Sequence, residues 1–159
     1  MKKSDVIFEK AQILDLDEIL SLVNITNKEW YSKIIPKEHY QEPFLTKEQL
    51  DNMSTFMDFF VHRVDGEIVA VGSFSIRDEE IAWIPLMTVR SDFQRRGIGS
   101  ELMLYLENLA KEQGFSNIQL ETDSMADWAL NFYTKHGYSV FKKEKNPWGH
   151  HVWLEKPLK

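Results

Sequence analysis

The sequence has no cysteine, and its seven glycines and five prolines form no linker. The missing thiols exclude a disulfide-stapled fold, zinc–thiolate sites and a cysteine nucleophile. The five histidines show no HExxH-type spacing, so we expect no metal. No apolar run approaches the length of a membrane span, and the two N-terminal lysines are followed by acidic residues, without a signal-peptide core. We therefore expect a cytoplasmic protein that has no membrane partner.

Positive charge is in the minority. Nineteen Lys and Arg residues face 25 Asp and Glu residues, which gives a formal net charge of −6. A general nucleic-acid surface usually carries a basic excess, so we expect no nucleic-acid partner. The 159 residues, 43% of them hydrophobic, suffice for one core. We predict a single domain over residues 1–159.

Hydrophobic periodicity predicts helices and strands that alternate along the chain. The predicted strands are 6–8, 59–64, 67–76, 81–89, 118–122, 138–142 and 150–155, and the predicted helices are 15–27, one from 46, one from 98 that ends at Gly114, and 126–136. Residues 30–44 are expected to be irregular. Asp15 with Glu18, and Thr46 with Gln49, have the spacing of a capping box.

The strand over residues 81–89 has a proline in its middle. Asp65-Gly66 predicts a tight turn in the hairpin before it. Pro85 removes one main-chain donor from the next strand, which should be bulged or splayed there. Such a strand exposes backbone groups, to which an extended ligand that carries amides could add like another strand.

The segment Gln94-Arg95-Arg96-Gly97-Ile98-Gly99 follows this strand and opens a helix. Its glycines allow a tight turn, so that main-chain N–H groups and the helix start face one phosphate group. A dinucleotide fingerprint needs a third glycine where Leu102 stands, and a Walker A lysine is absent. The pattern predicts a phosphate cradle, although a turn that only caps the junction would use the same glycines.

Two motifs resemble the GNAT superfamily of acetyl-CoA-dependent N-acetyltransferases. Gln94, Gly97 and Gly99 match its Gln/Arg-x-x-Gly-x-Gly/Ala signature, and residues 129–138 resemble its A-x-x-F-Y-x-x-x-G-F junction. The resemblance covers nearly the whole chain. It implies an α/β (α+β) fold with a central mixed, mostly antiparallel sheet of about seven strands and about four flanking helices.

The resemblance also implies a site for acetyl-CoA as co-substrate, without a metal. The residues implied to bind it are Met87, Thr88 and Val89 on the bulged strand, Gln94, Arg95, Arg96, Gly97, Ile98, Gly99 and Ser100 in the cradle, and Asn131. A main-chain N–H near Met87 or Thr88 would polarise the acetyl carbonyl. Tyr133 would protonate the departing thiolate, because a phenol keeps its proton at pH 7.

Two positions depart from the family pattern. Ala126 stands where many members have a coenzyme-binding asparagine, which leaves Asn131 or Ser124 for that contact. Leu86 stands where many have a glutamate as general base. No base is therefore assigned, and the candidates are Glu79, Glu80, His150, His151 or water.

The acceptor is expected between the first helices and the last hairpin. Trp30, Tyr31, Phe44 and Trp148, with Glu29, Glu38 and Glu42, favour a small cationic amine. A protein N-terminus or lysine, or a non-catalytic coenzyme A sensor, stays open as an alternative. The exposed aromatic residues leave a homodimer contact open, and whether the acyl group is acetyl or longer also stays open.

Overall fold

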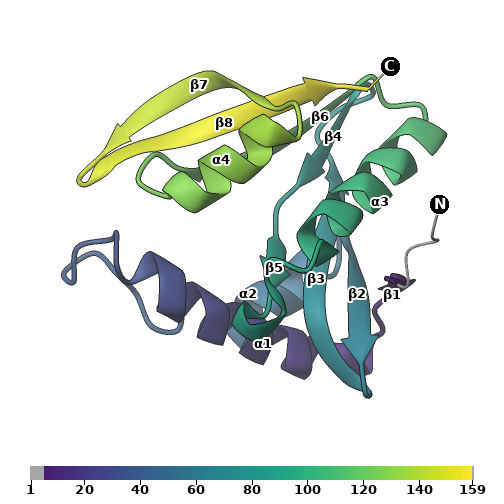
Figure 1. Ribbon diagram of the computed structural model, residues 1–159, viewed down its shortest axis with the longest axis horizontal. Coiled ribbons are helices and arrows are strands. Elements are labelled where there is room, and N and C mark those ends of the chain that lie inside the picture. The colour runs from purple at the N-terminus through teal and green to yellow at the C-terminus, as the bar shows by residue number, and fades with distance from the viewer. Residues whose placement is uncertain (1–5, 159) are drawn as a thin grey trace.

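The computed structural model describes residues 6–158, which form one mixed sheet of eight strands with four α-helices packed against it (Figure 1). The sheet order is β1-β2-β3-β4-β6-β8-β7, and β5 also pairs with β3. The strands are β1 (Glu9–Lys10), β2 (Asp58–Val64), β3 (Glu67–Ile76), β4 (Ile81–Ile84), β5 (Met87–Val89), β6 (Asn117–Asp123), β7 (Ser139–Asn146) and β8 (Gly149–Pro157). The α-helices are α1 (Leu16–Tyr31), α2 (Lys47–Met53), α3 (Ile98–Glu112) and α4 (Asp127–Lys135).

The predicted fold class is confirmed. Only the β4–β6 pair is parallel among the strand pairs of residues 6–158, and the other pairs are antiparallel. The structure has one strand more than expected because the predicted strand over residues 81–89 is divided into β4 and β5. None of the helices in this part of the chain is long and apolar enough to cross a bilayer.

The N-terminal prediction was wrong in two details. The first strand lies at Glu9–Lys10, beside β2, instead of at residues 6–8. Asp15 does not cap α1, because a 3-10 turn over Ile13–Asp15 precedes the helix and Asp15 already has helical backbone angles. Its carboxylate accepts instead from the Gln12 N–H at 2.8 Å, and Glu18 accepts from the Ile68 N–H at 2.7 Å.

The second capping box and the hairpin turn form as predicted. Thr46 Oγ1 accepts from the Gln49 N–H at 3.1 Å, and Gln49 Oε1 accepts from the Thr46 N–H at 2.9 Å. In the β2–β3 turn, Asp65 and Gly66 both have positive φ, at 52° and 81°. This is the backbone that an Asp-Gly pair favours.

The break at Pro85 separates two strand partners. β4 pairs with β6 from Ile81 to Ile84, whereas β5 pairs only with β3, where Met87 lies opposite Gly72. Figure 1 shows β5 continuing away from β4 and β6 toward α1. The edge of β5 that faces away from β3 therefore has no strand beside it among the described residues. The strand is splayed at Pro85, one of the two forms predicted from the sequence.

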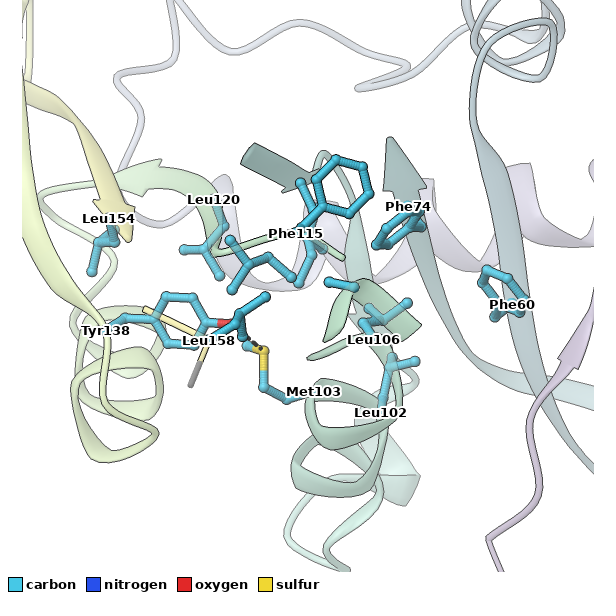
Figure 2. Close-up of a cluster of buried hydrophobic side chains, with 14 of the residues drawn as sticks. Phe60, Phe74, Leu102, Met103, Leu106, Phe115, Leu120, Tyr138, Leu154 and Leu158 are labelled. Atoms are coloured by element: carbon cyan, nitrogen blue, oxygen red, sulfur yellow. Dashed lines mark hydrogen bonds between the residues drawn. The ribbon is translucent and has the colours of Figure 1, made fainter. Parts of the chain in front are cut away.

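Two apolar clusters fix the helices on opposite faces of the sheet. α1 and α2 pack on Val61 and Val71 through a cluster that includes Leu50. α3 covers the other face, where Figure 2 shows Leu102 and Leu106 near Phe60 and Phe74. Beyond the irregularity that pairs Arg63 with Ile68, alternation along β3 sends Val71 to the α1 face and Gly72 and Phe74 to the α3 face. The N-terminus of α3 and the C-terminus of α1 thereby reach the same end of β5.

Candidate active site

A pocket of about 550 Å³ lies at this end of β5. Its walls come from the end of α1, from β5, from the turn into α3 and from α4. The lining residues are Thr26, Asn27, Trp30, Tyr31, Met87, Thr88, Val89, Gln94, Arg95, Gly97, Gly99, Ser100, Trp128, Ala129, Phe132, Tyr133 and Lys135. The structure thus brings nine of the twelve predicted site residues to one cavity.

The turn into α3 has an unusual backbone. Arg95 and Gly97 have positive φ, at 64° and 83°, and Gly97 is the N-cap of α3. The left-handed conformation is strained for an arginine, and such strain concentrates at functional sites. The Glu101 N–H bonds the Gly97 carbonyl at 3.0 Å, so the N–H groups of Ile98, Gly99 and Ser100 have no carbonyl of this helix to bond. These groups form the geometry of an anion cradle.

The open edge of β5 presents main-chain groups to the pocket. Leu86 and Arg90 bond β3, through Ser73 N–H to Leu86 O and Arg90 N–H to Val69 O, each at 2.8 Å. Alternation then turns the backbone of Thr88 toward β3 and that of Met87 and Val89 toward the pocket. Gln94 Nε2 donates to the Val89 carbonyl at 2.9 Å, so the N–H groups of Met87 and Val89 are the donors at this edge, and the Met87 N–H lies further from the cradle.

Tyr133 lines the pocket beside Phe132, with ring centroids 5.6 Å apart. Burial is the main reason why the pKa of its phenol is raised above the usual value, and the nearby Tyr31 raises it further. The phenol therefore keeps its proton throughout the neutral range. A protonated hydroxyl at a cavity wall is suited to donate a hydrogen bond or a proton.

The far end of the pocket is aromatic. The Trp30 and Trp128 rings lie 5.2 Å apart, and the Tyr31 ring lies 5.4 Å from Trp128. Tyr31 Oη is 3.4 Å from Thr122 Oγ1 on β6, and burial raises the pKa of Tyr31. The buried Thr26 hydroxyl has no hydrogen-bond partner within residues 6–158. Such a group is unfavourable unless a ligand or water satisfies it.

A model of the acetyltransferase (GNAT) family matches residues 19–138, which hold the cradle, β5 and Tyr133. The chain belongs to this family.

Relatives and solved structures agree with this assignment. The chain is 26% identical over 136 residues to the probable N-acetyltransferase camello of Xenopus tropicalis, covering 81% of this chain and 62% of that protein. It is 26% identical over 84 residues to N-alpha-acetyltransferase 50 of Danio rerio, covering 49% and 50%. The chain therefore spans at most about three fifths of these curated relatives. Its fold matches the PaiA N-acetyltransferase from Thermoplasma acidophilum in complex with coenzyme A, with a TM-score of 0.80, 19% identity, and coverage of 97% and 99%.

Three residues predicted for the GNAT site do not line the pocket. Ile98 is buried in the core, so it contributes only its main chain to the turn. Arg96 stacks its guanidinium over the Phe93 ring, 4.7 Å from the centroid. Asn131 is exposed on α4. Ser124, the other candidate for the missing asparagine contact, accepts instead from the His150 N–H at 2.9 Å.

None of the candidate bases lines the pocket either. Glu79 and Glu80 precede β4, at the strand end opposite to β5, and the Glu80 carbonyl accepts from the Asn117 N–H. His150 is exposed, and His151 Nε2 lies 2.7 Å from Glu121 Oε1. The lining residues, all within the described chain, include no Asp, Glu or His.

Reasoning from the sequence did not predict six of the lining residues for the site: Thr26, Asn27, Trp128, Ala129, Phe132 and Lys135. Trp128 and Lys135 lie four residues before and three residues after Phe132, and this helical spacing was the available signal. The two α1 residues gave none, since they stood at the end of a predicted helix whose continuation to Tyr31 was not foreseen.

Proposed function

We propose that the chain transfers an acetyl group from acetyl-CoA to the primary amine of a small cationic molecule, by direct attack. The observation that carries this proposal is the shared cavity, which is lined by residues of the cradle, by β5 and by Tyr133. Membership of the GNAT family and the fold shared with a coenzyme A complex support the choice of donor.

The residues present fit this donor. Arg95 and Lys135 supply positive charge to the pocket, as phosphate groups require. A Cβ placed on Gly97 would meet nothing within 4 Å, so the space over the turn is open to a pyrophosphate. The unpartnered Thr26 hydroxyl offers a hydrogen bond to a polar group of a bound molecule. The pantetheine arm, which carries amides, would lie along the open edge of β5.

In the reaction, the acceptor nitrogen bonds to the acetyl carbon while the carbon–sulfur bond breaks. The Met87 N–H would stabilise the negative charge that develops on the carbonyl oxygen. Tyr133 would give its proton to the departing thiolate, and later regain one from solvent. The extra proton of the attacking amine leaves to water, since the lining residues of this part of the chain include no carboxylate or imidazole.

The lack of a base in the pocket predicts a particular pH dependence. An amine attacks only when neutral, and a reference primary amine such as that of lysine has a pKa near 10.4. We expect kcat/KM to rise with pH along the titration of the acceptor's own amine. Two acceptors whose amines differ in pKa should therefore show rising limbs displaced by that difference. A limb that stays at one pH for both acceptors would instead indicate a base supplied by the enzyme.

The acceptor end of the pocket favours a small cation. Trp30, Trp128 and Tyr31 can hold an ammonium group over their rings. The loop after α1 and the β7–β8 turn meet where His39 lies 5.5 Å from Trp148. We expect this contact to limit the room for an extended peptide acceptor. The acidic residues expected here, Glu29, Glu38 and Glu42, do not line the pocket. Glu42 pairs with Lys28 at 2.9 Å.

A protein N-terminus is the second candidate acceptor, and the similarity to N-alpha-acetyltransferase 50 favours it. A panel of polyamines, an aminoglycoside, amino-acid amides and N-terminal peptides, assayed for free thiol, tests both. We expect kcat/KM for the small cations to exceed that for peptides by more than about tenfold. The reverse order would move the function to peptide acetylation, and binding of acetyl-CoA without turnover of any amine would indicate a sensor. Homodimer formation and a cytoplasmic location stay predictions.

A further inference from the structure

Ser100 and His136 join the two helices that border the cradle. Ser100 lies in the first turn of α3 and lines the pocket, whereas His136 is the C-cap of α4 and does not line it. Ser100 Oγ and His136 Nε2 are 3.0 Å apart. The imidazole also packs on Phe132, with ring centroids 4.5 Å apart. The Ser100 hydroxyl, in the first turn of α3, thus has an ionisable group as its partner.

The direction of this hydrogen bond decides what Ser100 offers to an anion. A hydroxyl has one proton and two lone pairs. If Ser100 donates to a neutral His136, its lone pairs are left for the pocket, and these repel a phosphate oxygen. If His136 donates through Nε2, the Ser100 proton is free for the phosphate. A bound anion therefore selects a form of His136 with a proton on Nε2. Of the two such forms, the imidazolium is favoured over the neutral Nε2–H tautomer because its positive charge also attracts the anion.

The charges around His136 set the conditions for its protonation. Burial lowers the pKa of the imidazole, and the cations of Lys156 on β8 and Lys135 on α4 lower it further, while Glu107 on α3 raises it. Lys156 is already paired with Glu107 at 2.9 Å. In the free protein His136 is therefore mostly neutral near pH 7. A polyanion that reaches Ser100 adds negative charge and favours the imidazolium.

We propose that His136 is a positioning residue for the coenzyme: protonated, it donates to Ser100 Oγ and turns the Ser100 hydroxyl proton toward a pyrophosphate oxygen in the cradle. This inference rests on the proposed function, because it takes the cradle to be the coenzyme site. Protonation of His136 on binding makes coenzyme affinity depend on pH, which main-chain N–H groups alone would not do. The complex holds one proton more than the free protein, so coenzyme affinity falls as pH rises through the interval between the free and bound pKa of His136.

Calorimetric titration with dephospho-coenzyme A tests the proposal. This probe has the pyrophosphate but lacks the terminal phosphate monoester, which would itself titrate in this range. For the unaltered chain we expect Kd to rise about threefold to tenfold between about pH 5.5 and about pH 8, since each unit of pKa shift corresponds to tenfold in affinity. Heats measured in two buffers of different ionisation enthalpy should show proton uptake on binding.

Three variants separate the contributions. His136→Gln keeps an N–H donor near the place of Nε2, so it should bind with little dependence on pH. Ser100→Ala should bind more weakly than the unaltered chain at low pH and should also lose the dependence. His150→Gln alters an exposed histidine outside the pocket and should keep the full dependence. Thermal melting of each variant confirms that it is folded.

The outcomes distinguish this inference from the proposed function. No binding of the probe by the unaltered chain at any pH would overturn the coenzyme site, and the inference with it. Binding with the same pH dependence in His136→Gln as in the unaltered chain would overturn only the role of His136. Loss of the dependence in both His136→Gln and Ser100→Ala, with proton uptake only in the unaltered chain and in His150→Gln, supports it.

Discussion

Tyr133 differs from the other buried tyrosine of the motif region in what surrounds its hydroxyl. Tyr138 Oη donates to Glu107 at 2.8 Å and contacts Met103 Sδ at 3.1 Å, as Figure 2 shows for the latter. Tyr133 lines the pocket, and no hydrogen bond joins its hydroxyl to another described residue. The Tyr138 hydroxyl is therefore bonded within the core, whereas the Tyr133 hydroxyl is available to a ligand.

Tyr133→Phe should remove proton donation and leave binding intact. We expect kcat to fall by about 10²-fold to 10⁴-fold, the usual contribution of a positioned acid or base. The Kd for coenzyme A should stay the same, because the ring and its packing are retained. Thiol release gives kcat, and calorimetry gives Kd. An unchanged kcat with unchanged Kd would remove Tyr133 from the mechanism.

Tyr138→Phe is the matched control for this prediction. It deletes the same atom from a neighbouring tyrosine, whose ring lies 6.1 Å from that of Tyr133. The loss of a hydrogen bond to the buried carboxylate of Glu107 should lower the free energy of unfolding by about 1–3 kcal/mol. Its kcat should be unaltered under conditions where the variant is folded.

Single residues show where sequence reasoning succeeded and where it could not. Tyr133 was predictable because a local motif places it. Thr26 was not, because only the tertiary structure reveals that its hydroxyl is buried without a partner. The left-handed backbone of Arg95 was also hidden, since a non-glycine residue gives no signal for that conformation.

At the scale of elements, the cradle depends on the backbone that Gly97 and Gly99 allow. Gly97 has φ of 83°, so any substitution there strains the backbone and lowers both stability and binding. Gly99 lies within α3, and a Cβ on it would sit 3.4 Å from Phe132 Cζ, an ordinary contact. A substitution at Gly97 therefore changes stability and binding together, whereas a substitution at Gly99 can change binding alone.

Gly99→Ala should weaken coenzyme binding without lowering stability. Alanine favours a helix over glycine by up to about 1 kcal/mol, and the added methyl group finds room beside Phe132. Because Gly99 also lines the pocket, we expect the same methyl group to narrow the space in which a phosphate approaches the N–H groups. We expect the Kd for coenzyme A to rise at least about tenfold, near 1.4 kcal/mol, with an unchanged or higher melting temperature.

Gly114→Ala serves as the control at the other end of α3. Its φ of 88° makes a side chain unfavourable by about 1–2 kcal/mol, although a Cβ there meets nothing within 4 Å. This variant should lose stability and keep its coenzyme affinity. If Gly99→Ala also kept its affinity, the turn would only cap the junction between strand and helix.

The two capping boxes illustrate the limit of local patterns. Asp15 with Glu18 and Thr46 with Gln49 have the same spacing, yet only the second pair forms a box. Asp15 forms an ion pair with Arg63 of β2 at 2.7 Å, and Glu18 accepts a hydrogen bond from the N–H of Ile68 on β3. Contacts with distant strands thus override the local preference, whereas Thr46 and Gln49 are exposed and free to follow it.

At the scale of the whole molecule, the site exists because β5 parts from β6. Pro85 predicted that the strand would be interrupted, but it did not predict that β5 would lack β6 as a neighbour. That depends on the parallel pairing of β4 with β6, which joins Ile84 to Leu120 and then stops. The pocket also needs α1 on one face and α3 on the other, an arrangement set by long-range packing and only implied by family resemblance.

Gly72 links this packing to the cradle. It lies on β3 opposite Met87, and a Cβ on it would meet the Cδ1 atoms of Leu102 and Leu106 at 3.0 Å each. Both leucines are fully buried in the cluster of Figure 2, so neither has free space to move into. The missing side chain of Gly72 therefore lets α3 approach the sheet closely. We expect this approach to set the distance between the α3 N-terminus and β5.

Gly72→Val should accordingly impair the core and the site together. We expect a loss of about 1–3 kcal/mol in the free energy of unfolding from overpacking, with a higher Kd for coenzyme A because α3 is displaced. Urea unfolding and calorimetry measure the two effects. Leu106→Ala alone should lower the free energy of unfolding by about 2–5 kcal/mol. The double variant Gly72→Val/Leu106→Ala should lose less than the sum of the two single losses, because the valine fills the space that the leucine vacates. The double variant should also recover coenzyme affinity relative to Gly72→Val. Strict additivity with no recovery would show that the closeness of α3 to β3 does not control the cradle.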